Sequence, residues 1–135
     1  VPEAARANKY IARAESMAAQ ITNDDASATM HGFAVSSGQV TARASVVMGP
    51  ADFDQMEPGS ILVSPLTTPA WTQLFAHAAG LVTDLGSILA HGSIVAREYG
   101  IPAVLGVGNG TERIAHGQLI TIDGDAGTVV IREEV

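Results

Sequence analysis

The chain has no cysteine among its 135 residues. Disulfide bonds and thiol chemistry are therefore excluded, and this absence is typical of a reducing compartment, so we expect a cytoplasmic protein. Basic residues are also scarce, because seven Lys and Arg stand against 14 Asp and Glu, for a net charge of −7. Nucleic acids and anionic membranes require clustered cations, so neither is expected as a partner.

Long apolar runs are missing too, and no stretch has the length of a membrane span or the pattern of a secretory signal. Aromatic residues make up only 4% of the chain, yet 47% of its residues are hydrophobic. That content is sufficient for one globular domain with its own core. Because the chain opens at Val1 rather than Met, we expect it to be a piece of something longer.

Metal-ligand spacing is absent as well. The four histidines are far apart in the sequence, and no His-x-x-x-His pair occurs, so no metal site is predicted. The chain also lacks the phosphate-binding loop Gly-x-x-x-x-Gly-Lys-Ser/Thr, so we do not expect it to bind ATP through such a loop.

Hydrophobic spacing divides the chain into two parts. Residues 2–22 carry apolar side chains at helical spacing, which predicts either a linker helix to other domains or a helix that docks on this one. Residues 23–29 are small and polar, as in a hinge. Residues 30–135 form the main domain: alternating strands at 33–35 and 40–46 read as an antiparallel pair, and a buried strand is predicted at 61–63.

A helix is predicted to follow at residues 69–78, with Thr68 as its N-cap and Pro69 in its first turn. Trp71 is expected in the core or on a docking surface. Near the end of the chain we expect a helical turn at 111–114 and two strands, 118–123 and 128–132, joined by a Gly-rich turn.

The most informative stretch, residues 81–107, reads as strand, glycine-bearing loop, helix and strand. The helix is predicted over residues 92–99, with Gly100 and Pro102 as stop signals. His91 stands where the loop meets the helix. The N-terminus of a helix is positively polarised, so it disfavours an imidazolium and would stabilise a phosphoryl group carried on the neutral ring. On spacing alone, a histidine that merely starts a helix is the commoner interpretation.

The residues around His91 carry a more specific signal. They read Gly86-Ser-Ile-Leu-Ala-His91-Gly-Ser-Ile-Val-Ala-Arg97, followed by Pro102-Ala-Val-Leu-Gly106. This pattern resembles the phosphohistidine domain of the phosphoenolpyruvate-utilising enzymes, such as pyruvate phosphate dikinase, phosphoenolpyruvate synthase and rifampicin phosphotransferase. The resemblance covers about residues 30–132 and implies a swivelling three-layer β/β/α domain of the α/β class, preceded by the N-terminal linker helix.

Two positions depart from the family pattern. Ser87 stands where the family has a second glycine, and Leu89-Ala90 stands where it has Thr-Ser before the histidine. In plant-type dikinases that threonine is a regulatory phosphorylation site, so this control is not expected here. The Ala-His-Gly variant is most similar to the rifampicin phosphotransferase branch.

The resemblance also implies the site residues. His91 matches the phosphorylated histidine, and Thr67 matches a threonine whose hydroxyl can bond the ring or the phosphoryl group. Gly92 and Ser93 are expected to assist in phosphate binding or in orienting the ring. For Arg97, a phosphate contact and an exposed position paired with an acid remain equally open. For Asp84, capping of its loop is favoured over orienting the ring.

By resemblance, His91 accepts a phosphoryl group from the β-phosphate of ATP or from phosphoenolpyruvate and passes it to an acceptor. The expected partners are an ATP-grasp-type nucleotide-binding domain, which would hold ATP and Mg²⁺, and an acceptor-binding domain; no cofactor is expected on this chain. Two alternatives remain. One is an interaction module that has lost catalysis, and the other is a small-molecule or metal-binding domain that uses His91 as a ligand.

Overall fold

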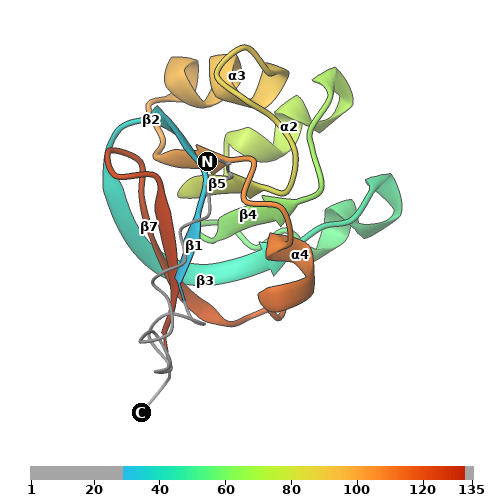
Figure 1. Ribbon diagram of the computed structural model, residues 1–135. Helices are drawn as coiled ribbons and strands as arrows, with labels where there is room; N and C mark the ends of the chain where they lie inside the picture. Colours follow the sequence, from blue (N-terminus) through green and yellow to red (C-terminus); the bar gives the residue numbers. More distant parts are fainter. Residues whose placement is uncertain (1–28, 133–135) are drawn as a thin grey trace.

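The computed structural model describes residues 29–132. The expected helix of residues 2–22, and almost all of the expected hinge, lie outside the described residues. The described part contains β1 (Thr29–His31), β2 (Phe33–Ser36), β3 (Gln39–Val46), β4 (Ile61–Ser64), β5 (Gly80–Thr83), β6 (Ala103–Leu105), β7 (Leu119–Asp123) and β8 (Thr128–Ile131). These strands hydrogen-bond in the order β1-β8-β7-β3-β4-β5-β6-β2 (Figure 1).

The central strands are parallel and buried on both faces. β4 pairs in parallel with β3 and β5, and β5 pairs in parallel with β6. Every residue of β4, β5 and β6 is buried, which explains why their sequences are short continuous apolar runs instead of alternating ones. Because successive side chains point to opposite faces, these strands supply two separate cores.

The first core lies between the sheet and the helices. Leu62, Leu81 and Leu105 pack there against Phe75 and Val95 from α2 (Thr72–Phe75) and α3 (His91–Tyr99), which lie together on one side of the sheet in Figure 1. The second core is formed by the alternate residues of the same strands and by the antiparallel strands β7 and β8; it includes Ile61, Val63, Val82, Val104, Ile120, Ile122 and Val129. The three-layer β/β/α fold expected from the sequence is confirmed.

One bent segment closes the sheet. β1 and β2 stand at opposite ends of the strand order but are separated in sequence only by Gly32, so β1 pairs with β8 and β2 with β6. A Cβ atom at Gly32 would lie 2.5 Å from the carbonyl oxygen of Leu105, so only glycine fits at the bend. Through these two pairings, residues 29–36 hydrogen-bond to β8 and to β6, which would otherwise be the edge strands of the sheet. The sheet therefore resembles a barrel and has no long unpaired edge.

Two local predictions are corrected by the structure. The strands at 33–35 and 40–46 do not pair with each other, because β2 pairs with β6 while β3 pairs with β7 and β4. The helix expected at 69–78 is shorter, with a 3₁₀ turn η2 (Pro69–Trp71) followed by α2, and the Thr68 side chain makes no capping bond. Trp71 is a core residue at 5% exposure.

The helix that carries His91 matches its prediction closely. α3 begins at His91 and ends at Tyr99, and Gly100 follows in the left-handed conformation with φ of 71°. Ile101 N–H donates to the carbonyl of Ala96, and Gly100 N–H donates to that of Arg97, which is a Schellman ending. The other helices of residues 29–132 are η1 (Pro50–Gln55) and α4 (Gly110–Arg113).

Candidate functional site: the His91 hollow

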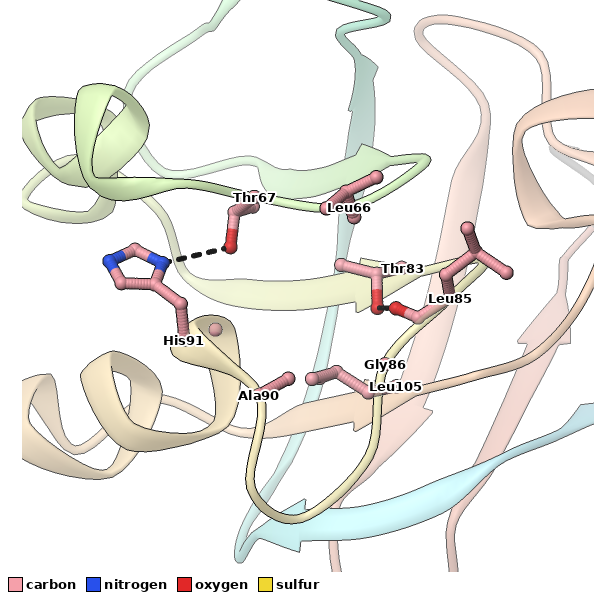
Figure 2. A pocket seen from close by; sticks show the side chains of 9 residues that line it. Leu66, Thr67, Thr83, Leu85, Gly86, Ala90, His91 and Leu105 are labelled. Atoms are coloured by element: carbon pink, nitrogen blue, oxygen red, sulfur yellow. Dashed lines mark hydrogen bonds between the residues drawn. The ribbon is translucent and has the colours of Figure 1, made fainter.

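A small open hollow lies where the parallel strands end. Thr67 follows β4, Thr83 is the last residue of β5, and Leu105 is the last residue of β6. Ligand sites of open α/β sheets gather at these carboxyl ends. The hollow has a volume of about 140 Å³ and is lined by Leu66, Thr67, Thr83, Leu85, Gly86, Ala90, His91, Gly92 and Leu105 (Figure 2).

His91 is the first residue of α3 and is half-buried. No side chain caps this end of the helix, and Ala90 precedes it in an extended conformation. Within residues 29–132 the backbone N–H groups of His91 and Gly92 make no hydrogen bond, whereas that of Ser93 donates to the carbonyl of Ala90. The two unpaired N–H groups and the helix dipole create a positive potential beside the ring. The predicted position of His91 at the start of a helix is therefore confirmed.

The imidazole is held from two sides. The Thr67 hydroxyl lies 3.3 Å from Nδ1 of His91, as the dashed line in Figure 2 shows. The Phe75 ring meets the imidazole edge to face, with centroids 6.3 Å apart and planes at 85°. The other ring nitrogen, Nε2, points away from Thr67 in Figure 2. Among residues 29–132, Nε2 has no hydrogen-bond partner, so this nitrogen is available for chemistry.

Gly92 allows α3 to approach the Thr67 loop. A Cβ atom at Gly92 would lie 3.0 Å from Oγ1 of Thr67 and 3.1 Å from Cδ2 of Leu81. Both contacts are tighter than ordinary van der Waals packing. The glycine thus sets the separation between the helix end and the hydroxyl that contacts His91.

Arg97 and Ser93 form a pair on another side of α3. Nη1 of Arg97 donates to the Ser93 hydroxyl at 2.8 Å and to the Val35 carbonyl at 3.1 Å. Ser93 is fully buried, and its backbone N–H donates to the carbonyl of Ala90. Neither the Arg97 guanidinium nor the Ser93 hydroxyl is part of the hollow. Their hydrogen bonds tie α3 to β2, and the phosphate contact considered for these two residues stays a prediction.

The Asp84 carboxylate hydrogen-bonds the start of α4, not α3. Its Oδ1 accepts the backbone N–H of Thr111 at 3.0 Å, and its Oδ2 accepts the Thr111 hydroxyl at 2.6 Å. The carboxylate caps the first turn of α4 and does not contact the imidazole. The favoured role, capping of its own loop, is wrong, because the group that the Asp84 carboxylate caps lies 27 residues away, at the start of α4.

Within residues 29–132, no group of three or more His, Asp or Glu side chains is arranged to hold a metal ion. None of the helices in this same part of the chain is both long and apolar enough to span a bilayer.

Sequence reasoning missed part of the lining. Leu66, Thr83 and Leu105 line the hollow although no motif marks them. Each lies at or just after the carboxyl end of a parallel strand, so the strand pattern is the signal that would have found them.

Comparison with known proteins agrees with this geometry. The family model described as "PEP-utilising enzyme, mobile domain" matches residues 56–127, more than half of the chain. The chain belongs to this family. The family match includes Thr67, His91 and the whole of α3, so the hollow lies inside the shared region.

Several relatives of this chain are named as phosphotransferases. An uncharacterised phosphotransferase of Bacillus subtilis, YvkC, is 42% identical over 120 residues, which is 87% of this chain and 14% of YvkC. A rifampicin phosphotransferase of Streptomyces sviceus is 47% identical over 100 residues, 74% of this chain and 11% of that protein. This chain thus spans only a small fraction of the curated relatives it matches.

The fold has a solved counterpart. The solution structure of the Enzyme I (nEIt) protein superposes with a TM-score of 0.53 and 31% identity, covering 61% of this chain and 34% of that one.

Proposed function

We propose that this chain is a phosphoryl-carrier domain in which Nε2 of His91 is transiently phosphorylated. The observation that carries the proposal is the contact between Thr67 and Nδ1 of His91 at the first residue of α3. If Thr67 accepts the Nδ1 proton, the tautomer is fixed and the lone pair lies on Nε2, which makes that atom the nucleophile.

The proposed cycle has two displacements. Nε2 attacks the phosphorus of the donor, an N–P bond forms, and the bond from phosphorus to the leaving oxygen breaks. The Nδ1 proton stays on the ring, donated to Thr67. An acceptor oxygen that has lost its proton to a base of the acceptor-binding domain then attacks the phosphorus, the N–P bond breaks, and His91 leaves as a neutral imidazole. The positive potential at the start of α3 favours the phosphorylated form electrostatically.

The donor and the acceptor belong to other parts of the enzyme in this proposal. A nucleotide-binding domain of the ATP-grasp type would hold ATP and Mg²⁺, or a separate site would hold phosphoenolpyruvate, and a further domain would bind the acceptor. The mobile-domain family and phosphotransferase relatives many times longer than this chain support such an arrangement. The carrier would travel between the two sites, as swivelling domains do.

The test is transfer of labelled phosphate. The chain is incubated with the nucleotide-binding domain and β-labelled ATP, with labelled phosphoenolpyruvate, or with phosphoramidate, which phosphorylates histidine without a protein partner. We expect acid-labile, base-stable label from ATP or phosphoenolpyruvate that is lost in His91→Ala and kept in His77→Ala, which alters an exposed histidine. Because phosphoramidate can phosphorylate any exposed histidine, its label is read at His91 alone, by peptide mapping. Label from ATP or phosphoenolpyruvate that persists in His91→Ala, or a wild-type chain that takes no label on His91 from any donor, would overturn the proposal.

A further inference from the structure

The loop from β5 to α3, residues 84–90, leads directly to His91 (Figure 2). The backbone N–H groups of its first two residues donate to the carbonyls of Ser64 and Pro65, at 3.0 Å and 2.9 Å. Among residues 29–132, the rest of the loop hydrogen-bonds only with itself, with the strand β5 before it and with α3. The attachment of the loop to its neighbours is therefore concentrated at its start.

Every polar group of Asp84, the first residue of this loop, is hydrogen-bonded. Its N–H donates to Ser64, as above, and its carbonyl accepts the N–H of Gly108 at 2.9 Å. Its carboxylate accepts the N–H of Thr111 at 3.0 Å and the Thr111 hydroxyl at 2.6 Å. Asp84 thus connects three segments: the one that leads to Thr67, its own loop, and the turn that precedes α4.

That turn, residues 106–111, in turn supports the loop. The N–H groups of Gly106 and Val107 both donate to the carbonyl of Thr83, at the end of β5. A Cβ atom at Gly106 would lie 2.8 Å from the carbonyl oxygen of Gly86, so the two backbones pack directly against each other. Gly86 lines the hollow. Losing the carboxylate bonds would therefore loosen the backbone that supports one wall of the hollow.

We infer that the Asp84 carboxylate is a positioning group for His91, an inference that rests on the proposed function. Asp84 does not touch the ring; it holds the segments whose separation sets the contact between Thr67 and Nδ1. That contact measures 3.3 Å, slightly beyond the usual ~2.7–3.2 Å, so a small further separation breaks it. A displacement of about 1 Å far from the reacting atoms can slow a reaction by ~10²-fold.

The test compares two substitutions at Asp84. Asp84→Ala removes both bonds to Thr111, whereas Asp84→Asn keeps them, because the amide oxygen accepts the N–H and the amide N–H donates to the hydroxyl. Phosphoramidate labelling at His91, read by peptide mapping, should slow roughly tenfold in Asp84→Ala and stay within about twofold of wild type in Asp84→Asn. Nitrogen-15 NMR of the ring should show the proton on Nδ1 in wild type and shared between both nitrogens in Asp84→Ala.

The matched control is Ser45→Ala, which loses bonds of the same kind. The Ser45 hydroxyl accepts the N–H of Glu57 at 3.1 Å and bonds the Ser60 hydroxyl at 2.7 Å, and none of these residues lines the hollow. Ser45→Ala should reduce stability in urea but leave the labelling rate and the ring signals as in wild type. If Asp84→Ala does not fold, Thr111→Val, which loses only the hydroxyl bond, should slow labelling by about threefold.

A double variant tests the route of the effect. Because the Thr67 contact is already lost in Thr67→Val, adding Asp84→Ala should slow that variant by less than about twofold. A full additional tenfold loss would show that Asp84 acts by another route. Wild-type labelling and ring signals in Asp84→Ala, or equal slowing in Ser45→Ala, would exclude positioning.

The conservative variant separates position from charge, because an Asp84→Asn chain as slow as Asp84→Ala would assign the effect to the negative charge and overturn the inference. A wild-type chain that takes no label on His91 from any donor would instead defeat the proposed function. The ring signals need no phosphorylation and would still report on positioning, so the two failures are distinguishable.

Discussion

The Arg97 guanidinium bonds the carbonyl of Val35, 62 residues earlier in the chain, and the neighbouring Ser93 hydroxyl. This arrangement ties the middle of α3 to β2, the strand that ends the sheet order. Because Arg97 follows the motif around His91, a phosphate contact was one of its two expected roles. Its observed bonds indicate a role in holding the helix that carries His91.

Arg97→Met is therefore expected to reduce stability more than chemistry. The variant keeps the aliphatic stem but loses both hydrogen bonds, which lowers the free energy of unfolding by about 1 kcal/mol because the side chain is largely exposed. Urea denaturation measures this change, and phosphoramidate labelling of His91 should remain within a few-fold of wild type. A variant with unchanged stability and abolished labelling would instead assign Arg97 to the phosphate.

Thr67→Val is expected to slow labelling of His91 by roughly tenfold, because the valine keeps the shape but leaves Nδ1 without its partner. The control is Thr68→Val, since the Thr68 hydroxyl makes no capping bond. The initial rate of phosphoramidate labelling is the measurement. Equal rates in the two variants would mean that the Thr67 hydroxyl does not orient the ring.

Gly92→Ala is expected to disturb the same contact through packing. Its methyl group would stand 3.0 Å from Oγ1 of Thr67, so either the loop or α3 must shift, at a cost of about 1–3 kcal/mol. Adding Thr67→Ala should recover part of that stability by removing the crowded hydroxyl, but it should not recover labelling. Urea denaturation of both single variants and the double variant measures this coupling, and strictly additive stabilities would contradict it.

Ser64→Ala is expected to stabilise the domain. The Ser64 hydroxyl is fully buried at the end of β4, and among residues 29–132 it has no hydrogen-bond partner. Removing an unsatisfied buried hydroxyl recovers about 1 kcal/mol. The matched control is Ser45→Ala, which should destabilise because Ser45 bonds Ser60 at 2.7 Å. Thermal unfolding of the two variants should therefore shift in opposite directions, and a destabilised Ser64→Ala would show that this hydroxyl has a partner.

Much of the local structure follows from the sequence alone. The stop signals at Gly100 and Pro102 predicted where α3 ends, because left-handed glycine and the lost proline N–H act within a few residues. The continuous apolar runs of β4 to β6 predicted strands buried on both faces. The motif around His91 predicted the family and the β/β/α layers, which the fold and the family match bear out.

Contacts between distant segments were decided only by the tertiary structure. The pairing of β2 with β6, and not with β3, depends on the bend at Gly32, which no local pattern reveals. The partners of Arg97 and Asp84 lie 62 and 27 residues away, so their hydrogen bonds arise only after the sheet has assembled. The backbone conformation of a short segment depends on the residues of that segment, so it can be predicted locally. The contacts of a side chain depend on how the whole chain packs.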